Sequence, residues 1–135
     1  MKRGKLWIAL ASTFLAAVPF IIPAIAKDEP AAEVDVAKVQ VATEVFTQMM
    51  SRAMNGEGYD IEDLELWSQH ILQAELDVAK NVVERAAAHQ AHLRRASELA
   101  RITASYAKTG QGRPADALAA EWYRLDAQSQ LEKTR

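Results

Sequence analysis

The sequence predicts an all-α protein, in which three helices form a long antiparallel hairpin or coiled coil after an N-terminal export signal. Two observations support this fold class. Residues 61–107 contain no Pro and no Gly, and their apolar side chains return every three or four positions, which is the period of an α-helix. Two Gly-containing segments, residues 55–59 and 109–113, interrupt the helical pattern, and Gly is the residue that most often ends a helix.

Residues 1–26 are typical of a secretory signal peptide. Three basic residues at the start are followed by an apolar segment over residues 6–22 and by the small-x-small site Ala24-Ile25-Ala26. We expect cleavage after Ala26 and a periplasmic location, because two prolines interrupt the apolar segment. The alternative is an uncleaved inner-membrane anchor, since the segment is just long enough to span a bilayer. In both cases only residues 1–26 would contact the membrane.

The composition of the exported part bounds its function. Residues 27–135 carry 13 basic and 18 acidic side chains, so nucleic acid is not an expected partner. The chain has no Cys, and helix packing alone must therefore hold it together. Twenty of these 109 residues are Ala, which favours helices but fills little core volume. A rod of this kind buries little surface as a monomer, so we expect self-association.

Residues 27–33 form a polar linker to the first predicted helix, which runs from about Val34 to Met54. Gly56 and Gly58 end this helix. Asp60 then begins the second helix, because its carboxylate can accept hydrogen bonds from the free amides of the first turn.

The second helix is predicted to be continuous over about 61–107. At ~1.5 Å per residue it would be roughly 70 Å long. Its centre is polar, and the alternative is a bend or break near residues 81–89 that folds the chain into a four-helix bundle. No Pro or Gly marks such a kink.

Pro114 suits the first turn of a third helix, where its missing N–H costs nothing. This helix is predicted to end near Lys133. The two outer helices together match the length of the middle one, so each can lie antiparallel to one half of it. Residues 34–135 therefore form one helical-hairpin domain.

The two turns are copies of one another at an offset of 54 residues. Ala53-x-x-Gly56-x-Gly58 aligns with Ala107-x-x-Gly110-x-Gly112, and the apolar positions that follow also align: Leu64 with Leu118, and Ile71 with Leu125. The chain therefore reads as a helical-hairpin repeat.

The second copy resembles the segment of TolC-like outer-membrane efflux proteins that turns back into a long helix. The resemblance rests on these spaced residues: Tyr106, Gly110, Gly112, Asp116, Leu118, Ala120, Arg124, Leu125, Ala127 and Leu131. It implies an α-helical hairpin in the periplasm, where that family forms an α-barrel for export. A TolC-like channel also needs transmembrane strands of roughly 9–11 residues. The sequence contains no such segment, so the resemblance implies the architecture and the location without the export activity.

Six side chains are candidate metal ligands: His70, His89, His92, Met49, Met50 and Met54. Two His three residues apart can share a metal ion, and thioethers select Cu(I). Surface His among arginines and gap-filling Met produce the same pattern more often, so no metal or other cofactor is assigned. A periplasmic metal-binding or envelope-stress-sensing protein is the alternative function.

Six apolar side chains form the predicted interaction face: Trp67, Ile71, Val78, Leu118, Trp122 and Leu125. They lie at helical spacing on the second and third helices, where a partner helix could dock. The expected partner is a second copy or another envelope protein. The sequence has no motif for a catalytic nucleophile, a phosphate-binding loop or a zinc protease. An exported structural or interaction protein, and not an enzyme, is therefore the predicted function.

Overall fold

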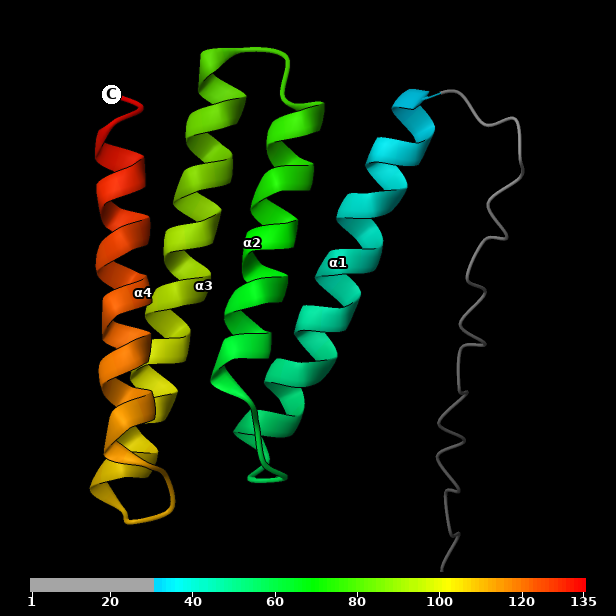
Figure 1. The fold of residues 1–135 in the computed structure, drawn as a ribbon. Helices are drawn as coiled ribbons and strands as arrows, with labels where there is room; N and C mark the ends of the chain where they lie inside the picture. Colours follow the sequence, from blue (N-terminus) through cyan, green and yellow to red (C-terminus); the bar gives the residue numbers. More distant parts are fainter. Residues whose placement is uncertain (1–30) are drawn as a thin grey trace, which may run out of the picture.

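The structure is a computed structural model that describes residues 31–135, and this part of the chain is entirely helical outside its turns. It contains α1 (Ala31–Met54), α2 (Ile61–Val78), α3 (Val82–Lys108) and α4 (Pro114–Glu132). Figure 1 shows the helices side by side in chain order, with α1 tilted away from α2 towards its N-terminal end. The all-α prediction is confirmed, whereas the predicted signal peptide lies outside the described residues.

The prediction of one long middle helix is wrong. Residues 61–107 form two helices, α2 and α3, because the backbone leaves the helical conformation at Ala79 (ψ 123°) and returns to it only after Asn81. Here α3 turns back and packs against α2 (Figure 1). The broken-helix alternative was therefore the correct topology, although the break comes before the predicted residues 81–89. The chain folds into four helices instead of a rod of three.

Two of the three predicted helices have nearly the predicted bounds. The first begins three residues early, at Ala31 instead of Val34, within the predicted linker. The last ends at Glu132, one residue before the predicted Lys133, and has Pro114 in its first turn as expected.

Asn81 starts α3 by capping its N-terminus. Its Oδ1 accepts a hydrogen bond from the backbone N–H of Glu84 (2.9 Å), and its Nδ2 donates to Glu84 Oε1 (3.0 Å). The second carboxylate oxygen of Glu84 accepts from the N–H of Lys80 (2.6 Å). This reciprocal arrangement satisfies amides that have no partner at a helix start. It makes a break here favourable without Pro or Gly.

We expect Asn81→Ala to lower the free energy of unfolding by about 1 kcal/mol, because Ala cannot accept the cap hydrogen bond. Urea unfolding followed by circular dichroism measures this loss. Lys80→Ala is the matched control, since Lys80 is exposed and adjacent, and it should change stability by less than about 0.5 kcal/mol. An unchanged stability in Asn81→Ala would show that the cap does not hold the break.

The two Gly turns have the same geometry at the predicted offset. Gly56 and Gly110 have φ of +73° and +72°, a left-handed conformation that Gly adopts without strain. Three hydrogen bonds recur at that offset: Asn55 N to Ser51 O and Thr109 N to Ser105 O, Gly56 N to Ala53 O and Gly110 N to Ala107 O, and Glu57 N to Arg52 O and Gln111 N to Tyr106 O. The structure thus consists of two hairpins, α1–α2 and α3–α4, which correspond residue for residue around their turns.

One core cluster joins all four helices. Its buried members are Ala42, Phe46, Met50, Ala53, Ile61, Leu64, Ile71, Leu99, Ala100, Ile102 and Ala120. The small side chains let helices approach closely, as Ala120 does at 0 % exposure. The two turn ends are also tied together, because Tyr106 of α3 donates its hydroxyl hydrogen bond to the carbonyl of Ala53 and stacks on Tyr59 with ring centroids 5.9 Å apart.

Candidate functional site

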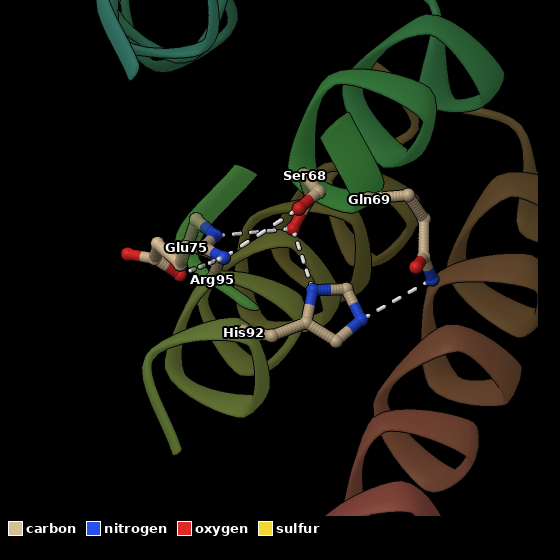
Figure 2. A network of polar contacts seen from close by, with 5 residues as sticks. All are labelled: Ser68, Gln69, Glu75, His92 and Arg95. Atoms are coloured by element: carbon tan, nitrogen blue, oxygen red, sulfur yellow. Dashed lines mark hydrogen bonds and ion pairs between the residues drawn. The ribbon is translucent and has the colours of Figure 1, made fainter. Parts of the chain in front are cut away.

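A buried polar network joins α2 to α3 (Figure 2). His92 of α3 is 0 % exposed and Ser68 of α2 is 1 % exposed. Ser68 Oγ lies 3.0 Å from His92 Nδ1 and also accepts from Arg95 Nε at 3.2 Å. On the other side of the imidazole, Gln69 Nε2 lies 3.2 Å from His92 Nε2. Arg95 then extends to Glu75 Oε2 at 3.3 Å, so one turn of α3 is held along two turns of α2.

The hydrogen-bond partners define the state of His92. The amide nitrogen of Gln69 can only donate, so Nε2 of His92 accepts and Nδ1 carries the proton. That proton is donated to Ser68 Oγ. This arrangement suits a neutral imidazole, and it agrees with a pKa lowered from 6.5 to about 4 by burial, by nearby Arg95 and by His89.

A carboxyl group lies beside this network without full compensation. Glu65 of α2 is 8 % exposed, and its Oε1 accepts from Gln69 at 2.7 Å. Its Oε2 is buried with no hydrogen-bond partner among the described residues. Burial raises the pKa of Glu65, and Asp126 of α4 adds to the increase, whereas the hydrogen bond from Gln69 opposes it. The carboxyl is therefore more easily protonated than an exposed Glu.

The Ser68–His92 pair does not form a nucleophilic site. Activation of a serine requires the histidine to accept the hydroxyl proton, whereas here His92 donates to Ser68. Both side chains are also buried between helices, so a substrate could reach Ser68 only if α2 and α3 separated. The arrangement fixes the position of α3 on α2.

The candidate metal ligands lie in different places. His92 is in the buried network, His70 packs edge-on against Trp67 with centroids 5.2 Å apart, and Met50 is in the core whereas Met54 is 58 % exposed. Within residues 31–135, no three His, Cys, Asp or Glu side chains are grouped so that they could hold a metal ion. The structure does not bring the six candidates into one site.

The predicted interaction face is divided between the core and the surface. Ile71 is 1 % exposed, and Trp67 and Val78 are half-buried. By contrast, Leu118, Trp122 and Leu125 are 74 %, 63 % and 50 % exposed. These last three side chains, the α4 row, lie on the side of α4 opposite the buried Ala120 and Ala127, because residues two apart on a helix point about 200° apart.

A groove lies between α1 and α2, with a volume of about 440 Å³. Its walls are mostly apolar, and residues of both helices line it: Val34, Ala37, Lys38, Val41, Ala42, Trp67, His70, Gln73, Ala74 and Asp77. The tilt of α1 opens the space between the two helices at this end (Figure 1). We call this space the α1–α2 groove.

Comparisons of the chain with protein-family models, with curated proteins and with solved structures found no match. Of the four helices described, none combines the length and the apolar character needed to cross a membrane.

Sequence reasoning missed the network and the groove. The partners Ser68 and Arg95 are 27 residues apart, and they meet only because the chain reverses at residues 79–81. The available signal was Asn81-x-x-Glu84, a capping pattern. Placing a helix start there would have brought His92 and Arg95 of α3 opposite α2.

Proposed function

We propose that this protein is an exported, periplasmic structural and interaction module, whose partner is another copy or another envelope protein. It resembles the helical hairpin of TolC-like proteins in its turns, and it would act by helix pairing instead of catalysis. The observation that carries this proposal is the α4 row, three large apolar side chains exposed on one helix face.

The α4 row has the features of a binding surface. Single exposed apolar side chains are common on proteins, whereas a contiguous group indicates an interaction site. Leu118, Trp122 and Leu125 follow one another at spacings of four and three residues, so they form a single ridge. Beside them Arg124 pairs with Glu121 at 2.7 Å and gives the ridge a polar edge. An apolar centre with a polar rim is typical of protein interfaces, and Trp is enriched among the residues that dominate binding.

Photo-crosslinking in cells tests this function. A photoreactive residue placed in the full chain at Ala115, one turn before Leu118 on the same face, should give one discrete adduct, either with a second copy or with one envelope protein. The uncrosslinked protein should have the mass of residues 27–135 and fractionate with the periplasm.

The matched control places the same photoreactive residue at Lys80, which is exposed between α2 and α3 and away from the α4 row. Adducts of equal yield at both positions, or none from Ala115, would contradict an α4 binding surface. A product that retains residues 1–26 would contradict the periplasmic form and favour a membrane-anchored one.

A further inference from the structure

The α4 row occupies the same repeat positions as a buried face of α2. At the offset of 54 residues, Leu118, Trp122 and Leu125 correspond to Leu64, Ser68 and Ile71. The three α2 residues are 0 %, 1 % and 1 % exposed, whereas their α4 equivalents are 74 %, 63 % and 50 % exposed. The first hairpin thus has this face covered, and the second hairpin has the same face bare.

The second hairpin provides the cover for the α2 residues. Ser68 bonds to His92 and Arg95 of α3, and α2 also contacts α4. The α2 face therefore rests against the α3–α4 hairpin. In repeat proteins each unit buries its apolar face against the next, and more than two units are usually needed for stability. This chain supplies two hairpins, and the second presents its stacking face to solvent.

The receiving positions on α3 have equivalents on α1. His92 and Arg95 correspond to Lys38 and Val41. Both equivalents line the α1–α2 groove, and Val41 is 49 % exposed. The repeat thus pairs Trp122 with Lys38 and Val41, just as Ser68 pairs with His92 and Arg95. The surface complementary to the α4 row is present on the same chain, at its opposite end.

We propose that the protein assembles head to tail, with the α4 row of one copy seated in the α1–α2 groove of the next. This contact repeats the packing of α2 on the α3–α4 hairpin, and it rests on the proposed interaction function. Because the two surfaces differ, the assembly grows into a ring or a filament.

The chemistry of the two surfaces is complementary. Trp122 meets an apolar wall that includes Val41, and the ammonium of Lys38 can lie over the indole face, an attractive arrangement. The groove also carries the anion Asp77, and Arg124 lies beside the row. The groove volume of about 440 Å³ falls among clefts of about 300–1,000 Å³ that hold small ligands, so it can admit an aromatic side chain.

The area favours this contact over a pair of α4 rows. From their exposed fractions, the three side chains present roughly 400 Å² of apolar surface. A stable interface buries about 800 Å² on each partner. Two ridges face to face would bury little beyond the rows themselves, whereas a ridge in a groove also covers both flanks of the ridge.

Complementation between two variants tests the proposal. Trp122→Asp disables the row and Val41→Asp disables the groove, and both residues are about half exposed or more, so the fold should persist. Two full chains with different C-terminal tags are co-expressed, purified through the first tag, and weighed by native mass spectrometry. Each variant alone should associate at least tenfold more weakly than the native chain. The two together should recover a one-to-one complex, because one intact row meets one intact groove.

Val83→Asp is the control, since Val83 is 74 % exposed on α3 outside both surfaces, and it should associate like the native chain. If circular dichroism shows that an Asp variant has unfolded, Trp122→Ala and Val41→Ala replace the pair. A native chain that associates while the mixed variants stay apart would overturn the head-to-tail contact and leave the interaction function standing. A native chain that is monomeric at all concentrations would also overturn it, and the crosslink from Ala115 then decides the interaction function separately.

Discussion

Leu64→Ala is expected to lower the free energy of unfolding by about 3 kcal/mol, whereas Leu118→Ala at the equivalent repeat position should change it by less than about 0.5 kcal/mol. The first side chain is 0 % exposed within the core cluster and the second is 74 % exposed. Removing Leu64 leaves a cavity between α2 and its neighbours, which close packing prevents from collapsing. Removing Leu118 leaves only a smaller surface.

The pair of variants controls for helix propensity, because the same residue is exchanged at matching repeat positions. Urea unfolding of dilute protein, where association is absent, measures both free energies. Equal losses would mean that the α4 row is buried in the monomer. In concentrated protein, Leu118→Ala should also lose stability relative to the native chain, since association stabilises the folded state.

Acidification should destabilise the protein through His92. The pKa of this imidazole falls from 6.5 when it is exposed to about 4 in the fold, so between these values the unfolded chain binds the extra proton. The stability contributed by neutral His92 is therefore complete above pH 7 and declines as the pH falls. Between pH 7 and pH 4 the loss is about 3 kcal/mol, and close to half of it occurs by about pH 5.5.

The variant His92→Gln isolates this contribution, because Gln stays neutral and retains hydrogen-bonding groups. The difference in unfolding free energy between the native chain and the variant should shrink by about 3 kcal/mol from pH 7 to pH 4. Other groups cancel in the comparison. Burial raises the pKa of Glu65, and this group acts in the opposite direction, since its protonation at low pH favours the fold. A difference that stays constant with pH would show that His92 is not buried in its neutral form.

Local patterns in the sequence predicted most of the helical structure. The turn at Gly56 and the turn at Gly110 were predicted because each needs a left-handed residue, and this need is visible without knowledge of the fold. The break at Asn81 was missed because Ala79 and Lys80 fit a helix as well as a loop. Only the hydrogen bonds between Asn81 and Glu84 decide between the two, and they act against an otherwise continuous helical pattern.

The candidate site could be predicted only in part. The spacing of Leu118, Trp122 and Leu125 identified a common face, but spacing does not reveal whether a neighbouring helix covers it. Ile71 has the same apolar pattern and lies in the core. The pairing of Ser68 with His92 depends on how α3 packs against α2, which no local pattern specifies.

The clamp at the turn ends has a consequence for motion. Tyr106 binds the C-terminal end of α1 through the carbonyl of Ala53, whereas the opposite end of α1 leans away from α2 (Figure 1). A helix held at one end moves as a lever about that end. Widening or narrowing of the α1–α2 groove is therefore a hinge rotation of α1 about Ala53, which moves Val34 much farther than Met50 and leaves the core around Phe46 nearly in place.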